Sequence, residues 1–346
     1  MTMRLSRVSV PMPLVVGMCV TVLIGCGLDL RRSVLPATLS DGDFWRLSGE
    51  LSEPGGVFTH SENLVSNEIL YVHTIRRLRA RGGAYIGVGP EQNFSYIARL
   101  RPAIAFIVDI RRENRNLHLM YKALFEVSAD RADFVSRLFS RQRPAGLGPA
   151  TSVREMFDAY ANVRPTPNLY QESMTMIRER LVSTHRFLMG EEDLEWIAQA
   201  LRAFYTDGPE IHYGRSLPSD AAGPSYRTLM TATDLSGTPR SYLATEDDFS
   251  FVKDLQARNV IVPIVGDFAG QRAIRGIGNY IREHRDLVQA FYGSNVEVYL
   301  NRAKVAAFCG NLATLPHASS TPFIDNKQMQ TFRSKLKACA PAQRAR

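Results

Sequence analysis

The stretch GGAYIGVGPEQNFSYIARLRPAIAFIVDIRREN, residues 82–114, has the order of a strand, a glycine turn, a helix, a second strand and an acid. Residues 84–88 are a short apolar run that leads into Gly89. Residues 104–110 are an apolar run interrupted only by Asp109, typical of a parallel strand that is covered on both faces. The helical apolar spacing between them comes from Phe94, Ile97 and Ala98. This order usually cradles a nucleoside-containing ligand.

The same alternation returns near the end of the chain. Thr245 and Asp248 resemble a capping box that opens a helix. Residues 259–265 are then expected to form a buried strand, residues 270–284 a helix and residues 287–292 another strand. Strands that alternate with helices indicate an α/β fold with a doubly wound, mainly parallel sheet.

The middle of the chain has a different pattern, with apolar residues at helical spacing between proline-rich joints. We therefore expect a helical insertion over residues 128–235. It separates the two halves of a Rossmann-like domain, 62–127 and 236–320. A helix is expected at 64–78, and residues 321–346 are expected to be a basic C-terminal tail.

The N-terminus has the pattern of a secretory signal, with Arg4 and Arg7 before a short apolar stretch. Leu-Ile-Gly-Cys at residues 23–26 resembles the bacterial lipobox, whose cysteine is lipidated. The sequence thus predicts a signal peptide at 1–25, lipidated Cys26 and a tether at 26–61. The expected location is a bacterial membrane facing the periplasm or cell exterior. The alternatives are an uncleaved anchor or a start codon assigned too far upstream, and the chain would be cytoplasmic if the signal is not real.

Composition and motifs exclude several other functions. The formal charge of +8 comes without aromatic interleaving or a nucleic-acid motif, so no nucleic acid is expected as a partner. The seven histidines have no metal-ligand spacing, and we expect no metal site. The sequence contains neither a Walker loop nor a Gly-x-Ser-x-Gly elbow. Cys309 and Cys339 could pair in an oxidising compartment, which the sequence leaves open.

The glycine turn favours one class of ligand. Gly87 and Gly89 follow a strand, and Asp109 ends the next strand, where an acid can bind both ribose hydroxyls. Against a pyrophosphate dinucleotide, Gln92 replaces the third glycine and Glu91 puts negative charge where the pyrophosphate would lie. S-adenosylmethionine has a ribose, no phosphate and a sulfonium cation that tolerates nearby carboxylates. It is the expected cofactor.

The alternating region resembles the class I S-adenosylmethionine-dependent methyltransferases. Their glycine loop, second-strand acid, third-strand Gly-Asp pair and polar fourth-strand motif match Gly87 and Gly89, Asp109, Gly266-Asp267 and Ser294-Asn295. The resemblance implies that Asp109 holds the ribose, Asp267 the adenine amino group, and that Asn295 faces the methyl donor. Tyr85 departs from the pattern, because an acid normally precedes the loop. The strings YIGVGPEQNFSYIARLRP and VSADRADFVSRLFSR also resemble an uncharacterised bacterial family with this pattern.

The candidate residues also have structural interpretations. Glu91 and Asn93 are candidates for binding the cofactor, and both could instead cap a helix or compensate its dipole. Asp267 could be a turn residue. Asn295 and Glu297, the candidates for catalysis, could cap a helix. The polar run at residues 66–68 is a further candidate for the lining of the pocket.

Two function classes follow. The first is a methyltransferase of unknown acceptor, with the helical insertion closing its pocket and transfer promoted by proximity and orientation. The second is a membrane-tethered protein that keeps the fold for binding or structure without catalysis. The lipobox favours the second class, because S-adenosylmethionine is made in the cytoplasm.

Overall fold

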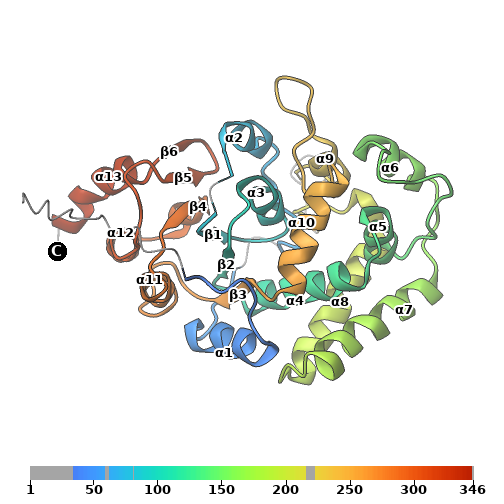
Figure 1. Cartoon of the computed structure of the whole chain (residues 1–346), viewed down its shortest axis with the longest axis horizontal. Coiled ribbons are helices and arrows are strands. Elements are labelled where there is room, and N and C mark those ends of the chain that lie inside the picture. The colour runs from blue at the N-terminus through green and yellow to red at the C-terminus, as the bar shows by residue number, and fades with distance from the viewer. Residues whose placement is uncertain (1–33, 59–61, 81, 216–222, 345–346) are drawn as a thin grey trace, which may run out of the picture. The chain divides into compact units, whose positions relative to one another are not determined.

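A computed structural model describes residues 34–58, 62–80, 82–215 and 223–344. Its centre is a six-stranded sheet in the order β3-β2-β1-β4-β5-β6 (Figure 1). Strands β1 to β5 are parallel, and β6 is antiparallel to β5. The strands are β1 Ala84–Val88, β2 Ile104–Asp109, β3 Ile261–Val265, β4 Val288–Ser294, β5 Pro322–Asp325 and β6 Met329–Thr331. The chain is an α/β protein, and the four strand segments expected from the sequence join one sheet.

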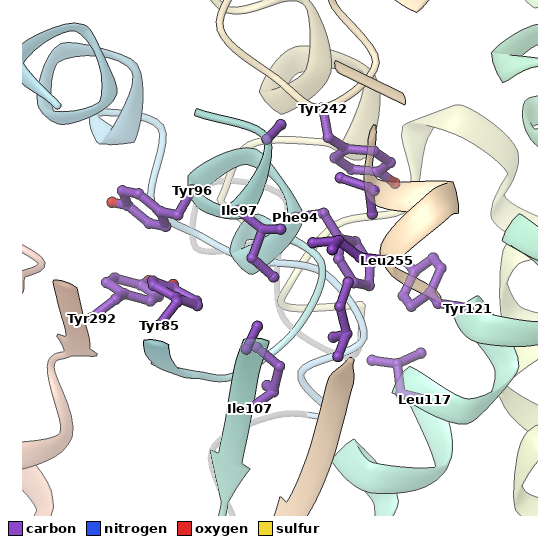
Figure 2. Close-up of a cluster of buried hydrophobic side chains, with 14 of the residues drawn as sticks. Tyr85, Phe94, Tyr96, Ile97, Ile107, Leu117, Tyr121, Tyr242, Leu255 and Tyr292 are labelled. Carbon is purple, nitrogen blue, oxygen red and sulfur yellow. The ribbon is translucent and has the colours of Figure 1, made fainter. Parts of the chain in front are cut away.

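The central strands are buried because helices cover both faces of the sheet. Every residue of β2 is buried, as its continuous apolar run predicts. Adjacent side chains of a strand point to opposite faces. The ring of Phe106 lies 5.7 Å from that of Tyr280 on one side. Ile107 lies on the other side, in the cluster around Phe94 and Leu255 (Figure 2).

Three helices cover the face that contains Ile107 (Figure 2). They are α3 Gln92–Leu100, α4 Arg112–Val127 and α10 Glu246–Ala257. The Thr245 side chain accepts from the backbone N–H of Asp248 at 3.1 Å, which confirms the expected helix start. On the opposite face lie α1 Asp41–Leu51 and α11 Ala273–Glu283, with α12 Arg302–Ala313 beside α11.

The described residues in the middle of the chain are mostly helical and contribute no strand to the sheet, in agreement with the helical pattern of their sequence. Its helices pack beside α4, and the longest of them, α8, contacts α4, α5 and α7. The segments are α5 Arg131–Phe139, α6 Val153–Tyr160, α7 Pro167–Arg178, the π-helix Glu179–Thr184, α8 Glu191–Asp207, the 3₁₀ turn Gly208–Glu210 and α9 Tyr226–Thr231.

Part of the expected tether is folded. Residues 41–51 form α1, and Ser40 caps it by accepting from the Asp43 N–H at 3.0 Å. This helix and the turn after it bind the open edge of β3: Glu53 N donates to the carbonyl of Val265 at 3.0 Å, and Val265 N donates to Ser52 at 3.0 Å. An edge strand without such partners would expose its backbone groups. The tether prediction is therefore wrong for residues 41–51.

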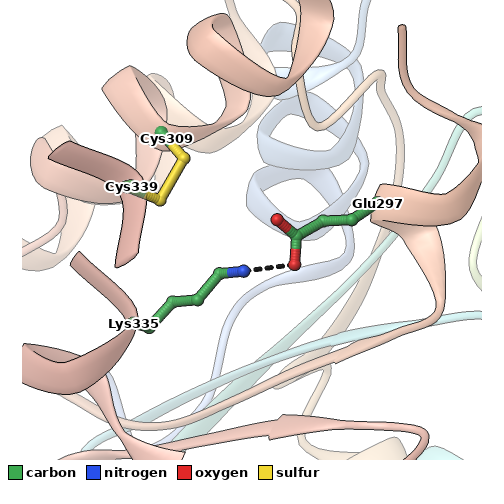
Figure 3. Close-up of a disulfide and its surroundings, with 4 residues drawn as sticks. All are labelled: Glu297, Cys309, Lys335 and Cys339. Atoms are coloured by element: carbon green, nitrogen blue, oxygen red, sulfur yellow. Dashed lines mark hydrogen bonds and ion pairs between the residues drawn. A yellow bond between two sulfur atoms is a disulfide. The ribbon is translucent and has the colours of Figure 1, made fainter. Parts of the chain in front are cut away.

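The expected basic tail is also folded. Residues 321–344 form β5, β6 and helix α13 Phe332–Arg344. Cys309 of α12 and Cys339 of α13 form a disulfide, the pairing that the sequence left open (Figure 3). Phe332 is completely buried, so α13 contributes to the core as well.

The helix expected at 64–78 is shorter, because α2 covers Tyr71–Arg77 only. Residues 64–66 are buried in an irregular segment before it. Asn63 has a positive φ of 50°, and the backbone N–H of Ser66 donates to the Glu91 carboxyl at 3.2 Å instead of to a helical carbonyl. These local interactions compete with a helix.

The expected signal peptide at 1–25 and Cys26 lie outside the described residues. Within the described ranges, no helix has both the length and the apolar character needed to cross a membrane.

Candidate functional site

A cavity of about 260 Å³ lies at the carboxyl edge of the sheet. From β1 the chain crosses to β2 on one side, and from β3 it crosses to β4 on the other side of β1. Ligands of open parallel sheets bind at such a reversal. The cavity brings together Gly89, Asp109, Asp267 and Asn295, which follow or end β1, β2, β3 and β4.

Gly89 gives the loop after β1 its shape. Its φ is +80°, a conformation that favours glycine, and the residue lines the cavity. The Asn93 amide holds the loop by donating to the carbonyls of Val88, Gly89 and Pro90 at 2.9, 3.1 and 2.8 Å. His118 Nε2 donates to the carbonyl of Gly89 at 2.9 Å. Burial lowers the pKa of His118 to about 4, so the imidazole is neutral at pH 7.

Gly87 and Asn93 support the loop and do not line the cavity. A Cβ on Gly87 would collide with Asn93 Oδ1 and the Tyr85 hydroxyl. That hydroxyl donates to Asn93 Oδ1 at 2.9 Å. Tyr85 thus occupies the position of the acid in the methyltransferase pattern and orients the amide that holds the loop.

Glu91 is completely buried and does not line the cavity. Its carboxyl accepts from the backbone N–H of Ser66, with both oxygens at 3.2 Å. Burial raises the pKa of Glu91 to about 8, so the group is mostly protonated at pH 7. It makes no side-chain cap at the start of α3. Its contacts join the segment before α2 to that helix end.

Asp109 ends β2 and lines the cavity. Its Oδ1 accepts from the backbone N and Nε of Arg111 at 3.0 and 3.1 Å, and its Oδ2 accepts from Nη2 at 3.1 Å. Only 7% of the Asp109 side chain and 6% of the Arg111 side chain are exposed. The carboxylate at the end of β2 is therefore already neutralised by the guanidinium beside it.

Asp267 also lines the cavity and is also paired with a cation. Its Oδ1 accepts from the backbone N–H of Ala269 at 2.9 Å, the turn contact considered from the sequence. Its Oδ2 lies 2.9 Å from Nζ of Lys304, which is a residue of α12 and lines the cavity as well. The two predicted acids thus meet at one cavity, each with its own cation.

Of the two residues predicted as candidates for catalysis, one lines the cavity and the other does not. Asn295 lines the cavity, and its amide donates to the Tyr299 hydroxyl at 3.2 Å. Glu297 lies in the 3₁₀ turn Val296–Tyr299 and does not line the cavity. It forms an ion pair with Lys335 of α13, close to the disulfide (Figure 3). Glu297 therefore connects the C-terminal helix to the sheet edge.

Glu68 is the last residue of the polar run at 66–68, which the sequence indicated only as a possible lining of the pocket. It lines the cavity together with Ser66 and Asn67. Its Oε1 accepts from the Ser294 hydroxyl, and its Oε2 accepts from Gln92 Nε2 at 3.5 Å. Burial raises the pKa of Glu68. Ser294 has a positive φ of 46°, so the strand end adopts a conformation that is uncommon outside glycine.

Sequence reasoning missed the aromatic walls of the cavity and Lys304. The aromatic lining residues are Phe58, Tyr213, Phe268, Tyr292 and Tyr299. Tyr292 packs at 4.7 Å against Tyr96 (Figure 2), and Phe58 meets Tyr299 edge to face at 5.1 Å. These residues come from four separate segments. No spacing along the chain could have grouped them.

A second, larger hollow of about 860 Å³ adjoins this cavity and shares Val57, Phe58 and Arg111 with it. Helix α8 forms its other side, with Trp196 and Arg202 among the lining residues. The helical insertion thus reaches the edge of the strand-end cavity. Within the described ranges, no group of histidine, cysteine and acidic side chains is arranged to hold a metal ion.

The chain matches a family described as Domain of unknown function (DUF7790) over residues 63–341. This match spans most of the chain, and the protein belongs to that family. It includes every element that contributes to the sheet and all four strand ends at the cavity. No curated protein matches the sequence.

Proposed function

We propose that this protein binds S-adenosylmethionine in the strand-end cavity of a doubly wound, Rossmann-like sheet and is tethered to a bacterial membrane. The observation that carries the proposal is the meeting of Gly89, Asp109, Asp267 and Asn295 at one cavity. These are the positions that match the methyltransferase pattern, and they come from four different strand ends. The reversal of chain direction between β1 and β4 supports the same site.

The residues present fit an adenosyl group. A carboxylate oxygen has two acceptor directions, and Asp109 Oδ2 receives one hydrogen bond from Arg111, which leaves one direction for a ribose hydroxyl. The cavity of about 260 Å³ suits one nucleoside-sized group and is small for a dinucleotide.

When bound, S-adenosylmethionine supplies a methyl group for transfer, and a methyltransferase is the first function that we propose. In this proposal, the protein's own residues hold the loop after β1 and position a methyl acceptor, and the aromatic rings exclude water. The adjoining hollow of about 860 Å³ offers room for such an acceptor. Proximity and orientation would then supply most of the rate enhancement.

Equilibrium binding to the purified full chain tests the proposal. S-adenosylmethionine and S-adenosylhomocysteine should bind, and nicotinamide dinucleotides should not. Asp109→Asn should weaken binding more than about tenfold, because a hydrogen bond to a charged acceptor is worth about 1.5–3 kcal/mol.

The matched control is Asp193→Asn, because Asp193 forms a similar bidentate pair with Arg112 away from the cavity. Absence of any adenosyl binding, or equal effects of the two substitutions, would contradict the proposal.

The second function is a tethered protein that binds without catalysis, and the disulfide favours it. Disulfides persist in oxidising compartments, whereas S-adenosylmethionine is made in the cytoplasm. Binding of an adenosyl ligand without transfer of a labelled methyl group to a bacterial envelope fraction would favour this function over the enzyme.

A further inference from the structure

Charge pairing inside the strand-end cavity leaves one carboxyl group without a cation. Among the described residues, three acidic side chains line the cavity, Glu68, Asp109 and Asp267. Asp109 is paired with Arg111 and Asp267 with Lys304, the two cationic side chains of the lining. Among the described residues, no cationic side chain lies within ion-pair distance of Glu68. Its side-chain hydrogen-bond partners are the hydroxyls of Ser294 and Tyr292 and the amide of Gln92.

Further hydrogen bonds fix the polar groups around Glu68. Gln92 Nε2 also donates to the Tyr292 hydroxyl at 3.3 Å, and the Ser66 hydroxyl donates to Gln92 Oε1. The carboxyl thus lies in a polar network at the cavity wall, and Tyr292 of the same network also lines the cavity. Burial raises its pKa, and the nearby carboxylate of Asp325 adds to this effect. An unpaired anion in such surroundings is unfavourable, and a bound cation would stabilise it.

We infer that the strand-end cavity takes a small organic cation, a sulfonium or a quaternary ammonium, and that Glu68 is its counter-ion. Five aromatic side chains line the cavity, and aromatic faces attract alkylated cations. A metal ion fits less well, because hard cations require several oxygen ligands and two of the three carboxylates are already paired. With Glu68 ionised, one monovalent cation would balance the charges of the described lining residues.

This inference rests on the proposed function only for the choice of an adenosyl ligand. S-adenosylmethionine carries a sulfonium, whereas S-adenosylhomocysteine has a neutral thioether at the same place. Choline and its neutral isostere 3,3-dimethyl-1-butanol make the same comparison without an adenosyl group. Comparing the two pairs therefore shows whether the cavity takes the cation as part of an adenosyl ligand or as a quaternary ammonium without one.

The experiment measures the affinity of all four compounds for the full chain and for Glu68→Gln. The substitution keeps the shape and removes the charge. We expect the preference for the cation over its neutral counterpart to fall by about tenfold or more, which corresponds to ~1.4 kcal/mol. Affinity for the neutral compounds should change less than about threefold. Glu172→Gln on the exposed face of α7 removes the same charge far from any cavity contact and serves as the control.

Each outcome decides between the inferences. If only the adenosyl pair binds and Glu68→Gln removes the preference, both the proposed function and the counter-ion role are supported. If only choline binds and depends on Glu68, the counter-ion role stands and the adenosyl proposal fails. If both adenosyl compounds bind equally well, with no effect of Glu68→Gln, the counter-ion role is overturned and the proposed function survives. If neither pair binds, both are overturned. Should Glu68→Gln fail to fold, the wild-type preference within each pair still decides, because equal affinities within both pairs overturn the role.

Discussion

Glu91 illustrates how a residue type can be predicted while its role is not. Its place at the start of α3 suggests a charge that faces the helix dipole or a ligand. The fold instead buries it completely and gives it the backbone N–H of Ser66 as partner. Because burial raises its pKa to about 8, the group acts as a neutral hydrogen-bonding side chain at physiological pH.

This burial predicts a pH dependence of stability. The pKa of Glu91 is about 4.5 in the unfolded chain and about 8 in the folded one, so the folded state binds the proton more tightly. Its contribution is complete below pH 4.5 and is lost as the pH rises to 8, by at most ~1.4 kcal/mol per pH unit. Glu91→Gln should remove this slope. Urea unfolding of both proteins at pH 5, 6, 7 and 8 measures it, and parallel pH profiles would contradict the prediction.

The acids at the cavity show what sequence can and cannot supply. Asp109 and Asp267 were predicted because each follows a buried strand, and the carboxyl ends of parallel strands meet at one edge. Their cations were not predicted as partners. Arg111 reaches back two residues, and Lys304 comes from a helix 37 residues further along the chain. Pairing depends on side-chain direction, which spacing alone does not give.

At the scale of elements, continuous apolar runs identified the strands because a strand that is covered on both faces has no polar positions. Helices with only one apolar face were harder to predict. Helix α1 and helix α13 have long polar faces, and each has few buried residues. Their places depend on tertiary partners, the open edge of β3 for α1 and the disulfide and Lys335 for α13. Intrinsic helix propensity is a weak guide where tertiary contacts determine whether a segment is helical.

The disulfide gives a prediction for these C-terminal elements. The bond closes a loop of 30 residues between α12 and α13, for which the loss of chain entropy is about 3–4 kcal/mol. Cys309→Ser with Cys339→Ser should lower the free energy of unfolding by that order and loosen α13 first. Hydrogen exchange of residues 332–340 and thermal unfolding measure the effect. Stability unchanged by the double substitution and by a reducing agent would show that the two cysteines do not pair in the protein.

At the scale of the whole molecule, the fold and the N-terminal sequence favour different compartments. The adenosyl ligand that we propose for the strand-end cavity is made in the cytoplasm, whereas the predicted lipobox would direct export and disulfides persist in oxidising compartments. The small organic cation that we infer would remove this conflict, because Glu68 would recognise the charge of the ligand in either compartment. The counter-ion role of Glu68 is therefore compatible with either compartment, while methyl transfer requires a supply of donor.

The compartment itself is testable through Cys26. If the lipobox is used, Cys26 becomes the lipidated first residue, and the mature protein should fractionate with membranes. Cys26→Ser should then block lipidation and leave the chain unprocessed, because the thiol is the lipid attachment site. Mass spectrometry of the mature N-terminus and fractionation of cells that express either form measure this. Gly25→Ala, which keeps a small residue before the cysteine, should be processed normally and is the matched control.

A soluble wild-type protein that retains Met1 or Met3 would place the chain in the cytoplasm. The methyltransferase would then be the better of the two proposed functions.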